Sequence, residues 1–383
     1  MNKPLHVLSV FGTRPDAIKM APLVSALENC PDIESTCCVT GQHREMLQTV
    51  LEAFGISPDI DLNIMSHGQT VTEVTSRVLT GLEKVLEQKK PDICLVHGDT
   101  TTGFASALAA YYQKIPVGHV EAGLRTDDRY SPHPEEMNRR IISRIASLHF
   151  CPTEQNGKAL KREGITEGVY VTGNTAIDAM KNTVRENYVF DVPELNGLDF
   201  EKTRVLLVTA HRRENYGQLD EIFTALRDIA RDFEDVMLVY PVHPAPVVSE
   251  AAARVLGGAE RVMLLQPLGL LDMHNLMARC CLVLTDSGGL QEEAPAMGKP
   301  VLVLRRETER PEAVEAGTVK LAGVGYDGIR ALATELLTDS AAYEAMSRAV
   351  SPYGDGNACE RIIKALRFAA LPNCGLSTVG TGD

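Results

Sequence analysis

The chain has 383 residues, of which 44% are hydrophobic and 23% are charged; this composition is typical of a soluble globular protein, and the length exceeds one ordinary core. Its 38 basic and 51 acidic residues give a net charge of −13, which argues against a nucleic-acid or anionic-membrane partner. The N-terminal apolar run is too short for a signal peptide, and no later run could span a bilayer, so we expect a cytoplasmic protein.

The spacing of cysteine and histidine residues indicates whether a chain is suited to disulfide bonds or to metal binding. The nine cysteines form no Cys-x-x-Cys pair, and their odd number favours buried thiols in a reducing compartment. The ten histidines show no metal-binding spacing, so we expect no metal. The Gly-x-Gly-x-x-Gly segment at 323–328 is followed by helical sequence only, whereas a dinucleotide fingerprint needs a further strand. We therefore expect no cofactor.

The first half of the chain alternates short apolar runs with helical stretches, a pattern that predicts a parallel sheet covered by helices on both faces. The expected strands are Leu5–Val10, Ser35–Thr40, Ile93–His97, Val117–Val120 and Leu148–Cys151, the last of which closes this half. The expected helices are Pro15–Leu27, Arg44–Phe54, Thr102–Tyr112 and Glu135–Ala146.

Residues 177–204 lose strand character, which predicts a helix and a connecting segment between two domains. A second series of strands follows at Val205–Thr209, Val236–Tyr240, Val262–Leu265, Leu282–Thr285, Val301–Leu304 and Thr318–Leu321. Closing helices are expected at Gly328–Leu337, Ala341–Val350 and Ala358–Ala370. We therefore predict an α/β fold of two Rossmann-like, doubly wound domains, with a ligand cleft between the carboxyl ends of their strands.

Charged side chains follow the predicted strands of the first domain. Arg14 and Lys19 lie near a helix N-terminus that favours anions, although they could be solvated charges. Asp99 and Glu121 follow neighbouring strands, so two carboxylates could face one cleft and serve proton transfer. Asp99 could instead cap the next helix.

Two acidic residues, Glu135 and Glu136, begin a predicted helix after Pro134. Negative charge is favourable in the first turn of a helix. A purely structural role for Glu136 therefore competes with a catalytic one.

Histidines follow the first two strands of the second domain. His211 is followed by Arg212 and Arg213, a combination suited to phosphate binding and acid–base chemistry. His243 follows the next strand and could equally be an ordinary loop histidine.

The sharpest local signal is Ser287-Gly288-Gly289, at a predicted strand-to-helix turn. Consecutive backbone N–H groups at a helix N-terminus bind phosphate, and Glu293, one turn further, could accept hydrogen bonds from ribose hydroxyls. Arg310 lies in a charged cluster after the next strand, where it could reach the same ligand.

Together these loops resemble the bacterial non-hydrolysing UDP-N-acetylglucosamine 2-epimerase family. The matching segments run in one collinear order over most of the chain: FGTRPDAIKMAPLV, TGQHREML, HGDTTT, VEAGLRT, PEEMNRR, TAHRREN, TDSGGLQEEAP, GKPVLVLR and TERPEAVEAGT. The resemblance implies the GT-B architecture, a homodimer and a UDP-sugar substrate. It implies an N-terminal domain of residues 1–176, with the C-terminal helix of about 358–383 packing back on it, and a UDP-binding domain of residues 177–357.

The resemblance also implies roles for individual residues. The family's catalytic set corresponds to Asp99, Glu121, Glu135 and His211. Its substrate-binding positions correspond to Arg14, Lys19, His243, Met273, Ser287, Gly288, Gly289, Glu293 and Arg310. In some members a second substrate molecule binds as an activator, and Gln42, His43 and Gln69 occupy resembling positions.

Three positions depart from the family pattern. Met273 stands where an aromatic residue is usual near uracil, and His133 replaces an aromatic residue before Pro134. Gly68 lacks the arginine that some members carry in the activator region. These departures bear on affinity and activation rather than on the reaction class.

The implied reaction interconverts UDP-N-acetylglucosamine and UDP-N-acetylmannosamine. Because no carbonyl adjoins C2, its proton is not acidic, and elimination of UDP to 2-acetamidoglucal followed by re-addition is the expected route. Asp99, Glu121 and Glu135 are the expected proton carriers, and His211 is expected to stabilise or protonate the leaving diphosphate. A GT-B glycosyltransferase, a hydrolysing epimerase, a non-catalytic UDP-sugar sensor and a modified UDP-sugar substrate remain alternatives.

Overall fold

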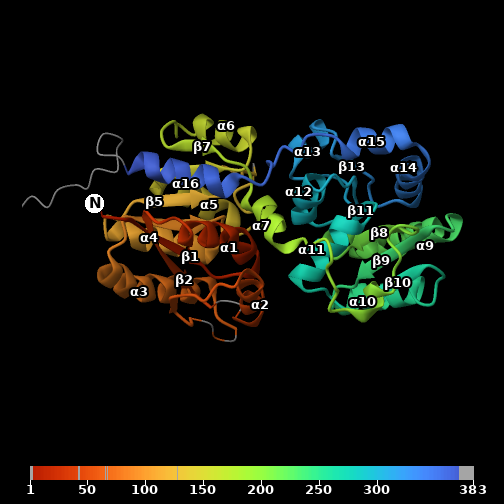
Figure 1. Ribbon diagram of the computed structural model, residues 1–383, viewed down its shortest axis with the longest axis horizontal. Coiled ribbons are helices and arrows are strands. Elements are labelled where there is room, and N and C mark those ends of the chain that lie inside the picture. The colour runs from red at the N-terminus through yellow and green to blue at the C-terminus, as the bar shows by residue number, and fades with distance from the viewer. Residues whose placement is uncertain (1–2, 42–43, 65, 67, 127, 371–383) are drawn as a thin grey trace, which may run out of the picture. The chain divides into compact units, whose positions relative to one another are not determined.

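The computed structural model describes residues 3–370 except residues 42–43, 65, 67 and 127 (Figure 1). Two compact units divide the chain. The first contains the residues up to Asn182 and those from Tyr353 onward, and the second is Thr183–Pro352. The chain first passes between the units inside the last turn of helix α7 (Thr175–Thr183), a few residues beyond the predicted junction at 176/177.

The first unit is built on a seven-stranded parallel sheet with the order β3-β2-β1-β4-β5-β6-β7. The chain leaves β1 in one direction for β2 and β3 and in the other for β4, so β1 and β4 flank the point where strand order reverses. The strands are β1 (Leu5–Phe11), β2 (Ile33–Val39), β3 (Ile60–Asp61), β4 (Ile93–His97), β5 (Val117–Val120), β6 (Leu148–Cys151) and β7 (Val169–Val171).

Helices cover this sheet, and the sequence explains their limits. Helix α3 shows this most clearly: Val74, Val78 and Leu82 repeat at four-residue spacing and are buried. The Thr70 side chain accepts a hydrogen bond from the backbone N–H of Glu73 and begins α3 with a capping box. The helices of the first half are α1 (Arg14–Glu28), α2 (Arg44–Phe54), α3 (Val71–Lys89), α4 (Thr101–Tyr112), α5 (Glu135–Ile145) and α6 (Glu154–Arg162).

The last described helix, α16 (Ala358–Ala369), belongs to the first unit and packs against α1 (Figure 1). Asp178 on α7 accepts hydrogen bonds from the backbone N–H groups of Ala358 (3.1 Å) and Cys359 (2.9 Å). These two bonds satisfy N–H groups that the first turn of α16 would otherwise leave unpaired. Residues 371–383 of the predicted C-terminal segment lie outside the described residues.

The second unit has a six-stranded parallel sheet with the order β10-β9-β8-β11-β12-β13, so its order reverses between β8 and β11. The strands are β8 (Arg204–Thr209), β9 (Val236–Pro241), β10 (Val262–Leu265), β11 (Leu282–Thr285), β12 (Val301–Val303) and β13 (Val319–Leu321). The helices are α8 (Pro193–Asn196), the 3₁₀ helix η1 (Arg213–Gln218), α9 (Leu219–Asp232), α10 (Pro246–Leu256), α11 (Leu270–Arg279), α12 (Gly288–Ala296), α13 (Pro311–Glu315), α14 (Tyr326–Thr338) and α15 (Ser340–Ser347).

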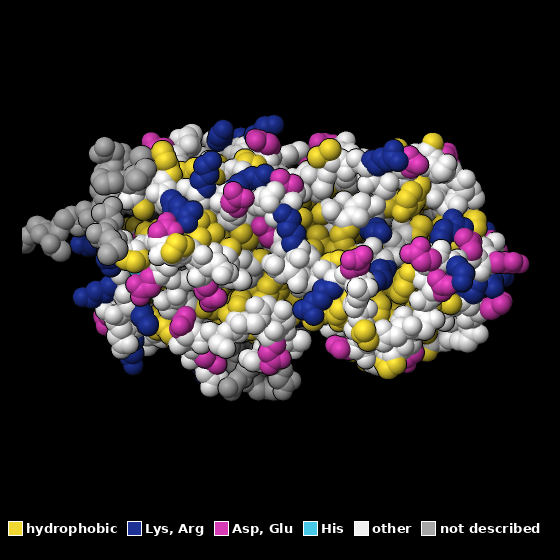
Figure 2. All heavy atoms as spheres, in the orientation of Figure 1, with side chains coloured by type: hydrophobic (Ala, Val, Ile, Leu, Met, Phe, Trp, Pro, Cys, Tyr) yellow, Lys and Arg dark blue, Asp and Glu magenta, His cyan; other side chains and the backbone are white. Residues whose placement is uncertain are grey.

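The predicted fold class, two doubly wound α/β domains, is confirmed by the two parallel sheets. One expectation was wrong: Leu148–Cys151 does not close the first half, because α6 leads on to β7, which pairs with β6. Among the described residues, no helix is long and apolar enough to cross a membrane. On the face shown in Figure 2, basic and acidic side chains are intermixed rather than gathered by sign.

Candidate active site

The predicted site residues of the first unit follow three adjacent strands, β1, β4 and β5. Arg14 and Lys19 lie on α1 after β1, Asp99 follows β4, and Glu121 follows β5. Parallel strands end at the same edge of a sheet, and ligands of doubly wound domains bind where strand order reverses. The topology therefore brings these four residues to one edge of the sheet.

The turn into α1 is closely packed. A Cβ at Gly12 would collide with the hydroxyl groups of Thr40 and Thr102, so a side chain there would disrupt the turn. Thr13 caps α1, and the side chain of Asp16 completes the capping box. Arg14 is thereby held, half-buried, at the first position of a helix whose N-terminus favours anions.

Glu121 is the most constrained of the predicted catalytic residues. Its φ of 64° lies in the left-handed region, a conformation that costs a non-glycine residue about 1 kcal/mol or more and often marks a functional site. Its carboxylate forms an ion pair with Lys19 and accepts a hydrogen bond from Asn174 Nδ2 at 3.5 Å. Its other oxygen, Oε2, lies 3.6 Å from Nε2 of His97.

Asp99 is held from α5. Thr100, and not Asp99, caps α4, so the capping alternative for Asp99 is wrong. The Asp99 carboxylate forms an ion pair with Arg139, and its backbone carbonyl accepts a hydrogen bond from Asn138 Nδ2 at 2.9 Å. The side chain remains 26% exposed, which leaves it open to a ligand.

The two acidic residues at the start of α5 differ in environment. Glu135 is half-buried at the first helical position, whereas Glu136 is fully buried. The Glu136 carboxylate accepts hydrogen bonds from Arg140 Nε (2.6 Å), the Thr126 backbone N–H (3.0 Å) and Arg139 Nη1 (3.2 Å). Glu136 therefore has a structural role and orients the arginine that holds Asp99.

In the second unit, His211 follows β8 and its loop is fixed by Asp286, a fully buried carboxylate that follows β11. Asp286 Oδ2 accepts hydrogen bonds from the backbone N–H groups of His211 and Arg212, both at 2.8 Å. Asp286 Oδ1 lies 3.3 Å from His211 Nδ1. Partial burial lowers the pKa of His211, the nearby charge of Asp286 opposes this, and His243 and Arg212 lower it further.

His243 follows β9 and stacks on His211, with ring centroids 5.3 Å apart and planes 12° from parallel. The structure therefore brings the two predicted histidines together. Met273 is half-buried on α11, after β10, at the position where the family pattern favours an aromatic residue.

The Ser287-Gly288-Gly289 segment forms the N-terminus of α12, as the sequence predicts, with Ser287 as the N-cap. A Cβ at Gly288 would lie 2.7 Å from Nη1 of Arg310, so this glycine allows a guanidinium to approach the helix N-terminus. A cation beside the positive end of a helix is unfavourable unless an anion binds there. The arrangement therefore favours a phosphate ligand.

Glutamates position the groups around this helix N-terminus. Arg310 Nε donates to Glu292 Oε1 at 2.6 Å, an interaction that the sequence analysis did not anticipate. Glu293, the predicted ribose ligand, has a side chain that is 15% exposed, and its Oε2 lies 3.8 Å from Nε2 of the buried His274.

Of the three predicted activator positions, Gln42 and His43 lie outside the described residues. Gln69 Oε1 accepts hydrogen bonds from the backbone N–H (2.8 Å) and the hydroxyl (3.0 Å) of Ser66. Gln69 Nε2 is buried without a hydrogen-bond partner in the described part of the chain.

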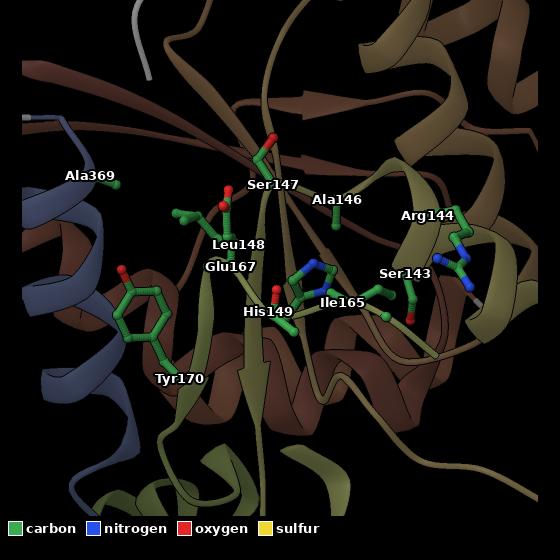
Figure 3. Close-up of a pocket in the computed structure, with 13 residues that line it drawn as sticks. Ser143, Arg144, Ala146, Ser147, Leu148, His149, Ile165, Glu167, Tyr170 and Ala369 are labelled. Carbon is green, nitrogen blue, oxygen red and sulfur yellow. The ribbon is translucent and has the colours of Figure 1, made fainter. Parts of the chain in front are cut away.

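A cavity of about 590 Å³ lies elsewhere in the first unit (Figure 3). Its lining includes Ser147, His149 and Tyr170, together with Arg144 of α5 and Ala369 of α16. Ser147 and His149 stand at the beginning of β6, whereas the predicted catalytic residues follow the carboxyl ends of their strands. We therefore do not assign the substrate to this cavity.

Among the described residues, neither the cysteine thiols nor the potential metal ligands form a second candidate site. The eight described cysteines are free, and burial raises the pKa values of Cys94, Cys151 and Cys280 to about 12. Among the residues that the structure describes, no three His, Cys, Asp or Glu side chains are grouped so as to hold a metal ion.

Comparison with known proteins gives independent evidence on the family of this chain. The family model described as UDP-N-acetylglucosamine 2-epimerase matches residues 25–367. The UDP-N-acetylglucosamine 2-epimerase of Bacillus subtilis (strain 168) is 55% identical over 368 residues, 96% of each chain. That of Escherichia coli (strain K12) is 52% identical over 378 residues, 95% of this chain and 98% of the relative.

Solved structures are similar to this chain over nearly its whole length. The UDP-GlcNAc 2-epimerase from Neisseria meningitidis bound to UDP-GlcNAc superposes with a TM-score of 0.85 at 46% identity, covering 94% of this chain and 99% of that one. A glycotransferase of kitacinnamycin superposes with a TM-score of 0.62 at 13% identity, covering 95% of this chain and 100% of that one. The second likeness shows the two-domain GT-B fold alone.

Proposed function

The chain belongs to the UDP-N-acetylglucosamine 2-epimerase family, and from this premise we propose that it interconverts UDP-N-acetylglucosamine and UDP-N-acetylmannosamine without hydrolysing either. The observation that carries the proposal is the presence of two sets of groups, one in each unit. Acid–base side chains follow β4 and β5 of the first unit, and the guanidinium of Arg310 lies beside the N-terminus of α12 in the second.

The reaction proposed is elimination followed by re-addition. The C1–O bond breaks, its electron pair leaves with UDP, and a proton is lost from C2, which gives enzyme-held 2-acetamidoglucal. UDP then adds back to C1 while C2 receives a proton on the opposite face. This route needs proton carriers on two faces of the ring and a firm hold on UDP, because release of either fragment ends the cycle.

We assign the proton carriers to Asp99, Glu121 and Glu135. The contacts of Asp99 with Arg139 and of Glu121 with Lys19 support this assignment, because each orients a carboxylate without burying it completely.

We assign the diphosphate to the second unit. Gly288 and Gly289 would offer backbone N–H groups, Arg310 would balance phosphate charge, and Glu293 would bind the ribose. His211 would face the leaving oxygen. Burial lowers its pKa in the free protein, and an arriving diphosphate would favour its protonation, so the imidazole could donate a proton as UDP departs. Lys19 and Arg14 of the first unit are also proposed to bind phosphate oxygens.

Product analysis tests this function. Purified protein is incubated with UDP-N-acetylglucosamine and followed by proton and phosphorus NMR. A growing UDP-N-acetylmannosamine signal, with total UDP-sugar constant, supports the proposal. Free N-acetylmannosamine with UDP would indicate the hydrolysing alternative, and no change would favour a sensor, a transferase or a modified UDP-sugar substrate.

Three further proposals concern oligomeric state, cellular location and regulation. We propose that the protein is a homodimer, that it acts in the cytoplasm, and that a second UDP-sugar binds near Gln69 as an activator. The free thiols suit a reducing compartment, and the unsatisfied Nε2 of Gln69 would gain a partner from a ligand. Light scattering tests the dimer, and the dependence of rate on substrate concentration in a Gln69→Ala variant tests the activator site.

A further inference from the structure

The last residue of β4, His97, lies between two carboxylates and belongs to none of the predicted site positions. Its Nδ1 is 3.1 Å from Asp16 Oδ1, and its Nε2 is 3.6 Å from Glu121 Oε2. The histidine and Asp16 side chains are each 4% exposed. One neighbour belongs to the capping box of α1, and the other is a proposed proton carrier.

The hydrogen bonds fix where one imidazole proton lies. Asp16 also accepts hydrogen bonds from the Thr13 backbone N–H (3.3 Å) and the Thr100 hydroxyl (3.2 Å). Because the Asp16 carboxylate accepts from both of these donors, we place a proton on Nδ1 of His97, where it points toward Asp16.

The other ring nitrogen then faces Glu121. Nε2 of His97 is buried and has no hydrogen-bond partner within the described part of the chain. An imidazole lone pair facing a carboxylate is unfavourable, whereas one proton between the two atoms makes the contact attractive. Hydrogen bonds of catalytic groups are often long in unliganded proteins and shorten when substrate binds.

The surrounding charges support one proton at this position. Lys19 from α1 pairs with Glu121, and Asp16 lies on the same helix. His119 of β5 adds no charge at neutral pH, because burial lowers its pKa to about 3. The two carboxylates and the ammonium leave one negative charge, which a proton shared between His97 and Glu121 neutralises.

We propose that His97, oriented by Asp16, is the positioning residue of Glu121 and exchanges one proton with it during the reaction. When Glu121 acts as the acid, the shared proton moves from Nε2 to Oε2 and then to C2 of 2-acetamidoglucal, which leaves Glu121 as a carboxylate and His97 as a neutral imidazole with its Nδ1 proton held toward Asp16. In the reverse direction Glu121 takes the C2 proton of the sugar and again shares it with Nε2 of His97. The proposal rests on the proposed function.

Two substitutions separate proton exchange from orientation. His97→Gln keeps an N–H that can reach Glu121 but cannot take up a proton, and His97→Leu removes both properties. His6→Gln is the matched control, because His6 is 4% exposed, lies on β1 of the same sheet, and has its ring Nε2 hydrogen-bonded to Thr36 Oγ1 at 2.9 Å.

The expected result is a loss of kcat by a factor of about 10² in His97→Gln, with KM and UDP affinity within about threefold of the parent, since general acid–base groups contribute on this scale. His97→Leu should lose at least as much, and His6→Gln should keep the parent kcat. If His97→Gln keeps the kcat of the parent, His97 does not exchange a proton with Glu121. If the His97 variants raise KM and leave kcat unchanged, His97 does not position Glu121 for the reaction.

A measurement on the intact protein decides the question even if the variants fold poorly. Nitrogen-15 NMR of labelled histidines should show a protonated Nδ1 at His97, and the Nε2 signal should move toward the unprotonated value in Glu121→Gln. A proton on Nε2 alone, or no response to Glu121→Gln, overturns the proposal. Because this readout does not use activity, an unreactive parent enzyme would instead count against the proposed function.

Discussion

The guanidinium of Arg310 lies so close to Gly288 that a Cβ added to this glycine would fall 2.7 Å from Nη1. Gly288→Ala should therefore displace Arg310 from the N-terminus of α12 and weaken UDP binding by a factor of about 10 to 100, the range expected for loss of a charge-assisted contact. Isothermal titration with UDP measures this change.

A glycine outside the proposed binding site supplies the control for that experiment. A Cβ at Gly217, in η1 of the same unit, would meet no heavy atom of the described residues within 4 Å. Gly217→Ala should bind UDP as the parent does. Equal affinity losses in the two variants would contradict the role given to Arg310.

Glu135 and Glu136 are adjacent in sequence, yet their substitutions should have opposite consequences. Glu136→Gln removes a buried charge that pairs with Arg139 and Arg140, and should lower the free energy of unfolding by about 3 kcal/mol. Glu135→Gln should leave stability unchanged and lower kcat by a factor of about 10² to 10⁴. Urea unfolding and initial rates are the measurements, and a fully active Glu135→Gln would remove this residue from the catalytic set.

Asp99→Asn should abolish inversion at C2 while UDP affinity stays close to that of the parent, because the carboxylate acts on the sugar and the second unit holds the nucleotide. Asp32→Asn is the control: it also removes an aspartate that pairs with an arginine of the first unit, Arg367, but it does so at an exposed position immediately before β2. Activity in Asp99→Asn comparable to that of Asp32→Asn would exclude Asp99 as a proton carrier.

Two buried histidines should make the fold sensitive to acid. Burial lowers the pKa of His119 to about 3 and that of His149 to about 4, whereas both take up a proton near pH 6.5 when unfolded. The unfolded state therefore binds more protons below that pH, and stability that is fully present above it is lost as the pH falls. From pH 6.5 to pH 5 the two should together lose about 3 kcal/mol.

Urea unfolding between pH 7.5 and pH 5 measures this loss. The free energy of unfolding should fall less steeply in His149→Gln than in the parent, because one of the two contributions is gone. Parallel pH profiles for the two proteins would show that His149 is not the source of the acid sensitivity.

Local sequence predicted most of the fold because buried parallel strands are short apolar runs with polar turns after them. Several elements escaped this reasoning, among them α3 and β7. The first turns of α3 are rich in Val and Thr, which weaken a helical signal. Strand β7 has only three residues, none of them fully buried, and so lacks an apolar run.

The candidate site was predictable where a residue directly follows a strand. Its supporting groups were not, because they come from other elements: Arg139 reaches Asp99 from α5, and Asp286 reaches the His211 loop from β11. Only the strand order, which depends on distant parts of the chain, makes these residues neighbours. His97 was hidden for the same reason, since a histidine at a strand end is otherwise an ordinary core residue.

The most direct test of the central claim is proton NMR of UDP-N-acetylglucosamine incubated with the purified protein in D₂O without added cofactor. Elimination and re-addition predict deuterium at C2 together with a growing UDP-N-acetylmannosamine signal. Formation of UDP-N-acetylmannosamine that keeps its original C2 proton would contradict proton exchange with the enzyme's carboxylates, and absence of both signals would contradict the epimerase function itself.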